Sequence, residues 1–315
     1  MRSGHRGEIR QAVQLHLQKL TREGLIKAEG KVRWRQYRLA SIAAQEQRFV
    51  LKQGFTEYAA WNQLRPRIDL ATDEQELFSY GVTEMVNNVI DHSGGKSMRI
   101  GLEKTAVSLT IAVSDNGVGI FNKISAALKL PDPRESILDL IKGKFTTDPK
   151  RHTGEGIFFT SRAFDRFSIA SSNLLFFHTS LRDDWSMTAQ KKSVKGTVVT
   201  MSLLLPAKRK LIEVFTPYSS GPEDYRFART RVPLSLATLI EESLMSRSSA
   251  KRVLARIDRF DEVIMDFAGI RSVGQAFADE IFRVFALAHP HVRLIPVNAN
   301  EQVTSMIRRA QAAGV

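Results

Sequence analysis

Residues 84–92 read Glu-Met-Val-Asn-Asn-Val-Ile-Asp-His, and their spacing predicts a helix with its polar side chains on one face. Glu84, Asn88 and His92 fall at i, i+4 and i+8, so they lie on consecutive turns of that face. The apolar side chains beside it belong to Val82, Met85, Val86 and Val89. A carboxylate and a carboxamide one turn apart can hold a hard cation such as Mg²⁺, which prefers oxygen ligands. Alone, the same pattern is also typical of a solvated helix face.

A second polar segment lies at residues 115–120, which read Asp-Asn-Gly-Val-Gly-Ile. It follows an alternating apolar run over residues 109–113, which predicts a strand. Asp115 therefore ends that strand, and Gly117 and Gly119 allow the backbone to approach a ligand closely. An Asp-Asn-Gly run by itself is usually a turn. Together with the helix, it predicts a nucleotide site.

The composition indicates a soluble protein with more than one domain. The chain has 315 residues, of which 43% are hydrophobic and 25% are charged, an ordinary globular balance. It has no cysteine, which excludes disulfides and thiolate metal sites and fits a reducing compartment. We find neither a secretory signal nor a run of roughly 20 apolar residues, so we expect a cytoplasmic protein without membrane contact. The net charge of +13 favours polyanionic partners.

The positive charge is concentrated in residues 1–38, where ten Lys or Arg and three Glu give 10 − 3 = +7. An apolar stripe predicts a helix that Gly24 ends, and a basic hairpin follows. The stripe consists of Ile9, Val13, Leu17 and Leu20. Residues 1–40 thus resemble the recognition helix and wing of a winged helix-turn-helix, without the helices that usually come first. We expect either a truncated or misassigned start, or a remnant used for dimerisation.

In that family the recognition helix enters the major groove of duplex DNA and the wing contacts phosphate. The residues that this resemblance implies for DNA contact are Arg6, Arg10, Lys19, Arg33 and Arg35. The alternative is a solvated basic helix or a dimer contact.

The next segments are expected to be mostly helical up to the polar helix. Residues 41–69 are predicted to form a helical connector that Pro66 breaks. Acidic residues at 73–76 open the following helix, which suits its dipole. Residues 98–102 and 107–113 are expected to form an antiparallel strand pair.

Residues 121–153 show no strand pattern. Within them, only residues 136–141 are predicted to form a helix. A polar, glycine-bearing loop of this length is usually functional and often forms a lid over a site. It leads into an apolar helix over 157–164, whose N-terminus offers backbone N–H groups to an anion. Strands are expected at 167–170, 174–180 and 197–204.

Five elements in this order resemble the GHKL ATPases, the superfamily of gyrase B, histidine kinases and anti-sigma-factor serine kinases. They are Glu84…Asn88…His92, the 115–120 segment, Phe145-Thr146-Thr147, Gly154-Glu155-Gly156-Ile157 and Gly196-Thr197. The resemblance covers residues 70–206. It implies a two-layer α/β sandwich, with a mixed sheet under a layer of helices and ATP held between helix and lid.

Carried over residue by residue, the resemblance assigns a role to each motif. Asn88 would ligate Mg²⁺, Asp115 would accept a hydrogen bond from the adenine amino group, and Glu84 would be the general base or the acid of the metal site. Gly117 and Gly119 would shape the pocket. Gly154 and Gly156 would cradle the phosphates, and Thr197 would reach the adenine side through water. The other residues expected to bind the nucleotide are Thr146, Thr147 and Ile157. Such a base has to orient one water towards the γ-phosphate.

Two positions depart from the family pattern. His152 stands where a lid glycine is often found, and Asp148 replaces the lysine that commonly follows Phe-Thr-Thr. Lys144, Lys150 or Arg151 are therefore the candidate substitutes for contact with phosphate.

A new pattern begins after a loop-rich linker at 207–231. Residues 232–315 alternate helices and strands, with helices predicted at 236–246, 249–257, 276–287 and 301–312 and strands at 262–267 and 292–297. This order predicts a parallel sheet. The run Val263-Ile264-Met265-Asp266-Phe267-Ala268-Gly269-Ile270 resembles a STAS-like domain, the fold of anti-sigma-factor antagonists. In those antagonists a kinase of the GHKL type phosphorylates a serine, but residues 274–276 here read Gly-Gln-Ala, without a hydroxyl.

The fold class that we predict is α+β: a GHKL sandwich flanked by a winged-helix-like element and a STAS-like α/β domain. We expect a homo-oligomeric regulator that binds ATP and Mg²⁺, with its C-terminal domain docking a protein partner. The alternatives are a serine/threonine kinase acting on a separate STAS partner and a pseudo-ATPase used only for interaction. A histidine kinase is disfavoured, because no helical hairpin with an acceptor histidine precedes the nucleotide motifs.

Overall fold

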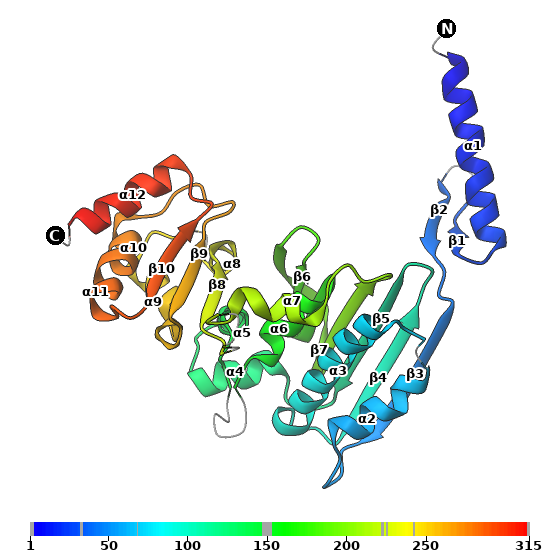
Figure 1. Cartoon of the computed structure of the whole chain (residues 1–315), viewed down its shortest axis with the longest axis horizontal. Coiled ribbons are helices and arrows are strands. Elements are labelled where there is room, and N and C mark those ends of the chain that lie inside the picture. The colour runs from blue at the N-terminus through cyan, green and yellow to red at the C-terminus, as the bar shows by residue number, and fades with distance from the viewer. Residues whose placement is uncertain are drawn as a thin grey trace.

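The computed structural model describes residues 3–31, 34–67, 69–146, 153–221, 224, 226–241 and 243–313. It shows three regions in chain order: a projecting helix with a small hairpin, a large sandwich, and a smaller parallel α/β domain at the far end (Figure 1). Within the described residues, no helix combines the length and the apolar character needed to cross a bilayer.

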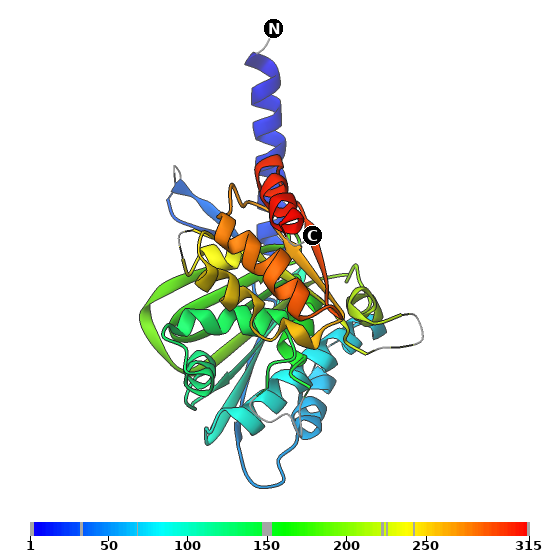
Figure 2. The same cartoon turned by 90° about the vertical axis from the view of Figure 1, so that its left-hand side faces the viewer.

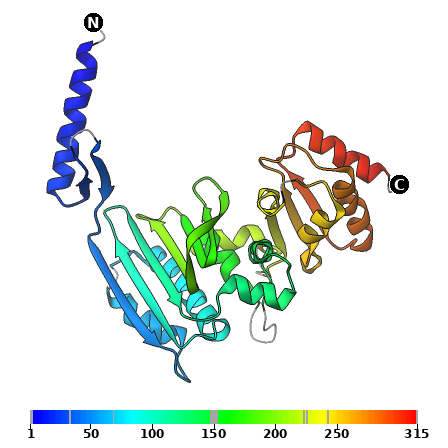
Figure 3. The ribbon, with the colours of Figure 1, turned by 180° about the vertical axis from the view of Figure 1, so that it is seen from behind.

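The N-terminal region is a helix followed by a hairpin. Helix α1 (Ser3–Arg22) leads into strands β1 (Ile26–Glu29) and β2 (Gln36–Leu39), which pair antiparallel. All three views show α1 standing away from the rest of the molecule (Figures 1, 2 and 3). Of the side chains described between residues 8 and 39, none is buried, and Ile9 is 57% exposed. Within the described residues, the apolar stripe that predicted α1 therefore meets no buried core, and only Leu17 and Leu20 of the stripe are half-buried.

The central region is a five-stranded sheet with the strand order β3-β4-β5-β7-β6. The strands are β3 (Ala43–Val50), β4 (Ser97–Lys104), β5 (Ser108–Asp115), β6 (Arg166–Thr179) and β7 (Asp184–Leu204). Every neighbouring pair is antiparallel, so the mixed sheet implied by the family resemblance is wrong for these strands. One face of β5 is fully buried because Leu109, Ile111 and Val113 alternate with more exposed residues.

Helices cover one face of this sheet, which confirms the two-layer sandwich (Figure 1). The main ones are α2 (Glu57–Leu64), α3 (Thr72–His92), α6 (Gly156–Ala163) and the short α7 (Leu211–Phe215). Helix α3 buries Leu77, Phe78, Val82, Met85, Val86 and Val89. Its core-facing stripe is therefore distinct from the face that carries Glu84, Asn88 and His92.

The predicted helical connector at 41–69 is wrong in its first half. Residues 43–50 form the edge strand β3, which pairs with β4 over its full length. Their Ala, Gln and Glu content is typical of helices, but pairing with a neighbouring strand overrides such weak local preferences. Phe49 anchors the strand, because it is buried and its ring lies 5.6 Å from that of Phe55.

The C-terminal domain has a three-stranded parallel sheet in the order β10-β9-β8, of which the alternation predicted the strands β9 and β10 but not β8. Its strands are β8 (Arg229–Pro233), β9 (Glu262–Asp266) and β10 (Arg293–Val297). Its helices are α8 (Leu234–Thr238), α9 (Arg247–Leu254), α10 (Gln275–Asp279), a π-helical stretch (Glu280–Phe285), α11 (Ala286–Ala288) and α12 (Glu301–Ala312). The predicted linker at 207–231 is wrong at both ends, because it contains α7 and the start of β8.

Two short helices lie between β5 and α6, and the second of them contacts the C-terminal domain. Helix α4 (Ile120–Leu128) follows the Asp115 turn, and α5 (Ser136–Lys142) lies where residues 136–141 were predicted to be helical. All seven residues of α5 are buried, because the sandwich packs on one side and the C-terminal domain contacts the other.

Candidate functional site

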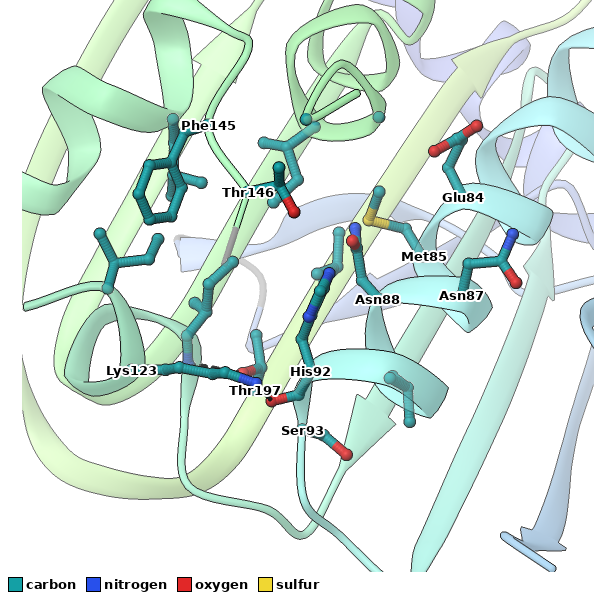
Figure 4. A pocket seen from close by; sticks show the side chains of 18 of the residues that line it. Glu84, Met85, Asn87, Asn88, His92, Ser93, Lys123, Phe145, Thr146 and Thr197 are labelled. Atoms are coloured by element: carbon teal, nitrogen blue, oxygen red, sulfur yellow. Dashed lines mark hydrogen bonds between the residues drawn. The ribbon is translucent and has the colours of Figure 1, made fainter. Parts of the chain in front are cut away.

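A cavity of about 310 Å³ lies between α3, the end of β5, the interior of β7, and the described ends of the loop around residues 146 and 153. Figure 4 shows Glu84, Asn88 and His92 following one another along α3 beside it. The predicted polar helix face is therefore one wall of the cavity. Met85 and Val89 add apolar surface to the same wall.

Asn88 holds a polar atom that the protein leaves unsatisfied. Its amide nitrogen Nδ2 is buried and has no hydrogen-bond partner within the described residues. A buried polar group without a partner costs about 1–3 kcal/mol. Because Asn88 lines the cavity, a ligand or its hydration shell would supply the missing partner.

Asp115 and Thr197 form the floor of the cavity on adjacent strands. Asp115 is only 9% exposed, and its Oδ1 accepts a hydrogen bond from the Gly117 N–H at 2.7 Å. The Thr197 hydroxyl accepts a hydrogen bond from the Ile120 N–H at 3.0 Å. Burial raises the pKa of Asp115, and hydrogen bonds from Gly117 and Thr197 partly counter this effect. The floor thus presents a buried carboxyl group on a backbone that these bonds hold in place.

The glycines of the 115–120 segment allow close packing. Gly119 has φ +86°, and a Cβ at this position would lie 2.6 Å from the Ser171 hydroxyl. Gly117 does not line the cavity; a Cβ there would collide with the main-chain carbonyl of Ser93 at the end of α3. Gly117 therefore shapes the site indirectly, because it lets the strand turn pack against the helix.

The loop returns to the cavity at Gly154, Glu155 and Gly156. Gly154 has φ +76°, and a Cβ there would lie 2.5 Å from the main chain of Phe145. Gly156 is the first residue of α6. A side chain at this position would collide with the Glu84 carboxylate and displace that carboxylate. Gly156 and Ile157 line the cavity, so the N–H groups of the first turn of α6 lie at its edge, where an anion would be favoured.

Glu84 and Glu155 bring two carboxyl groups to this end of the cavity. Burial raises the pKa of Glu84, and the charges of Glu155 and Glu57 add to the effect. Burial also raises the pKa of Glu155, against the opposing charge of Lys144. Two half-buried carboxyl groups repel each other when both are ionised. A cation between them, or a proton on one of them, would relieve that repulsion.

Most of the predicted site residues line this cavity. Those that line it are Glu84, Asn88, Asp115, Gly119, Thr146, Gly154, Gly156, Ile157 and Thr197. Thr147, Lys150 and Arg151 lie outside the described residues. Lys144 is not brought to the cavity: its Nζ donates to the Arg259 carbonyl oxygen at 2.7 Å, on the C-terminal domain.

Lys123 is a cavity residue that the motif analysis missed. It lies on α4, four residues after Gly119, and its Nζ donates to the His92 carbonyl oxygen at 2.6 Å (Figure 4). Burial lowers its pKa. The sequence signal that could have identified Lys123 is its position one turn into the helix that follows the glycine turn. Phe145, Glu155 and Leu140 also line the cavity and were assigned no contact.

The described residues fit Mg·ATP at the level of their chemistry. Asn88 and Glu84 offer the amide and carboxylate groups that Mg²⁺ uses together with phosphate oxygens and water. Asp115 offers a buried acceptor to a base amino group, and the start of α6 offers donors to phosphate. Bound Mg²⁺ would supply charge neutralisation at the phosphates.

The predicted DNA-contact residues that the structure describes belong to the projecting N-terminal region, away from this cavity (Figure 1). Arg10 and Lys19 are exposed on α1, and Arg35 is exposed in the hairpin. Lys19 also lies 3.9 Å from the Glu23 carboxylate. Arg33 and the side chain of Arg6 lie outside the described part of the chain.

Comparison with known families gives two matches. Residues 59–177 match the family described as "Histidine kinase-like ATPase domain", and residues 249–304 match "STAS-like domain of unknown function (DUF4325)". A comparison with curated proteins found no match. The first match spans α3, the Asp115 turn and the start of α6, and the second spans β9, β10 and their helices. The chain therefore contains a histidine kinase-like ATPase domain followed by a STAS-like domain.

Proposed function

We propose that this chain binds Mg·ATP in the α3 cavity and acts as a nucleotide-gated regulatory protein. The observation that carries the proposal is the buried, unpartnered amide of Asn88, which shares one cavity with Glu84 and Asp115. An ATPase-like domain joined to a STAS-like domain fits a regulatory role.

In this proposal each part of the cavity binds one part of the nucleotide. Asp115 accepts a hydrogen bond from the adenine amino group, and Thr197 supports the same end through water. The first N–H groups of α6, with Thr146 nearby, bind phosphate oxygens. Asn88 and Glu84 hold the Mg²⁺ that neutralises those phosphates.

Direct binding tests this assignment. A fluorescent, non-hydrolysable ATP analogue is titrated with the parent and with Asn88→Ala and Asp115→Ala, in the presence and absence of Mg²⁺. We expect Asn88→Ala to lose most of the Mg²⁺-dependent affinity and Asp115→Ala to lose affinity under both conditions. Equal binding by all three proteins would contradict the site.

A serine/threonine kinase acting on a separate STAS protein is the second candidate function. The favouring observation is Glu84, whose raised pKa suits a group that accepts a proton from a hydroxyl. Gly274 precedes α10 where the acceptor of an antagonist would stand, and the exposed Ser272 lies outside that helix. Incubation with γ-labelled ATP and a STAS protein separates the functions: label on protein supports the kinase, whereas free phosphate alone supports a slow ATPase.

For the N-terminus we propose contact with duplex DNA, with dimerisation as the alternative. The exposed basic side chains of Arg10, Lys19 and Arg35 support it. Binding to a duplex should weaken steeply with salt and disappear when residues 1–38 are removed. Retention of a salt-insensitive complex would contradict it. Sedimentation of the full-length chain and of the chain without residues 1–38 tests whether this region makes a homo-oligomer. If the shorter chain still associates, the STAS-like domain is the other candidate interface.

A further inference from the structure

Helix α5 contacts the nucleotide cavity and the STAS-like domain at the same time. Leu140 lines the cavity, as does Phe145 just after the helix. Asp139 and Lys142 are 6% and 2% exposed, although both carry charge. Charged side chains are almost never fully buried unless they are paired. Their partners show what covers this face of the helix.

Those partners belong to the STAS-like domain. The Nζ of Lys142 donates to the carbonyl oxygens of Arg252 at 3.1 Å and Ala255 at 3.0 Å, as well as to Asp139 at 3.2 Å. Asp139 forms an ion pair with Arg256. From β8, the Thr230 hydroxyl donates to the Lys142 carbonyl oxygen at 2.7 Å. The end of α9 therefore binds α5 through buried polar groups, which require a defined arrangement to be satisfied.

Arg256 connects this contact to the cavity wall. Its guanidinium carbon lies 5.2 Å from the centre of the Phe145 ring, while the same side chain is paired with Asp139. Its backbone is left-handed, with φ +62°, which a non-glycine residue adopts only where its surroundings hold it. The main chain of Phe145 in turn lies against Gly154. The positive φ of Gly154 and the closeness of that main chain leave no room for a side chain there. A shift of Arg256 would therefore alter the contact that its guanidinium group makes with the Phe145 ring.

We propose that Arg256 is a positioning residue for the nucleotide cavity, through which the STAS-like domain controls the ATP affinity of its own chain. The proposal rests on the proposed function, because it concerns the same cavity. Arg256 holds Phe145 and α5 in the arrangement that lines the site. By linkage, a domain that raises ATP affinity is itself held more firmly when ATP is bound. The STAS-like domain thereby becomes the element that reports nucleotide occupancy to a partner, and a partner that displaces it would release the nucleotide.

The test uses the full-length chain and a non-hydrolysable ATP analogue. Arg256→Gln is expected to weaken analogue binding about tenfold, within the range known for coupled sites. The matched control is Arg293→Gln in the same domain, because Arg293 is an exposed partner of Glu262 away from α5. The control should bind within about twofold of the parent. A general loss of folding would affect both affinity and melting temperature, so thermal unfolding is measured for each protein.

Two further variants, Phe145→Leu and the double variant that combines Arg256→Gln with Phe145→Leu, test whether Arg256 acts on the cavity through Phe145. If Arg256 acts through Phe145, the double variant binds no more weakly than Phe145→Leu alone, because neighbouring residues that share one route are non-additive. Independent, fully additive losses would contradict the route.

Hydrogen exchange on the unaltered chain keeps the proposal testable if Arg256→Gln does not fold. The analogue is expected to slow exchange at residues 252–260 and to leave 301–312 unchanged. Unchanged exchange at 252–260, or an Arg256→Gln protein that binds as tightly as the parent, would overturn the inference while leaving the proposed function intact. A parent chain that binds no analogue contradicts the proposed function, and the inference falls with it.

Discussion

Lys144 and Arg259 each bind the main chain of the other. The Nζ of Lys144 donates to the Arg259 carbonyl oxygen at 2.7 Å, and Nη1 of Arg259 donates to the Lys144 carbonyl oxygen at 3.0 Å. The Lys144 ammonium also lies 4.4 Å from the centre of the Phe260 ring. A lysine predicted to contact phosphate is therefore part of the contact between the two domains. Because its backbone adjoins Phe145, the contact begins beside the cavity wall.

Lys144→Met should lower stability without changing the discrimination between ATP and ADP. A phosphate-binding lysine would favour ATP, but this ammonium is directed to Arg259. Loss of its hydrogen bond and its contact with Phe260 should lower the free energy of unfolding by about 1–2 kcal/mol. Denaturant unfolding and analogue titrations check both parts. A selective loss of ATP over ADP binding would show that Lys144 reaches the phosphates.

Glu84→Gln should reduce the pH dependence of stability in the nucleotide-free protein. Burial, with the charge of Glu155, raises the pKa of Glu84 in the folded state. The folded state therefore binds this proton more tightly than the unfolded state does, and stability falls as pH rises from the ordinary carboxyl range of about 4.3 through the raised pKa.

The Gln side chain is neutral throughout, so the variant should melt at a higher temperature than the parent at neutral pH. The matched control is Glu103→Gln, because Glu103 is exposed on β4. Mg²⁺ favours the ionised Glu84, so the Mg²⁺-dependent part of ATP affinity should rise with pH in the parent and stay flat in Glu84→Gln. Parallel pH profiles for the parent and Glu84→Gln would contradict the assignment.

Asp115→Asn should weaken ATP binding at least tenfold while the protein remains folded. The new amide oxygen can still accept from the Gly117 N–H, so the turn is preserved. The amide nitrogen, however, turns an acceptor for the adenine amino group into a donor, which leaves buried groups unmatched. Calorimetric titration with ATP measures the loss, and circular dichroism confirms the fold. Unchanged ATP affinity would remove Asp115 from the base site.

Gly154→Ala should disrupt the cavity, whereas Gly54→Ala should not. Both glycines have positive φ, +76° and +82°, but only Gly154 has the Phe145 main chain 2.5 Å from the position of a Cβ. The shared backbone strain costs about 1–2 kcal/mol in either variant. The added collision with Phe145 should lower ATP affinity in Gly154→Ala alone. Melting temperature and analogue binding for the pair separate strain from collision, and similar ATP affinities would show that Phe145 can move aside.

Local periodicity was sufficient for the elements that carry the site. The i, i+4 spacing of Glu84 and Asn88 predicted their shared face, and the alternation before Asp115 predicted the strand that ends there. The order of helices and strands after residue 232 predicted the parallel strands β9 and β10, but not β8. These features depend on neighbours in the chain, so the amino-acid sequence alone determined them.

Only the tertiary structure decided where the remaining polar groups lie. Strand β3 forms because β4 offers it an edge, against the helical preference of residues 43–50. Lys144 turns to Arg259, Lys123 reaches the cavity, and Asp139 is buried by Arg256. Each outcome depends on hydrogen bonds and charges from segments distant in sequence. Burial makes those distant partners decisive, because a buried charge must be satisfied by whatever the fold brings to it.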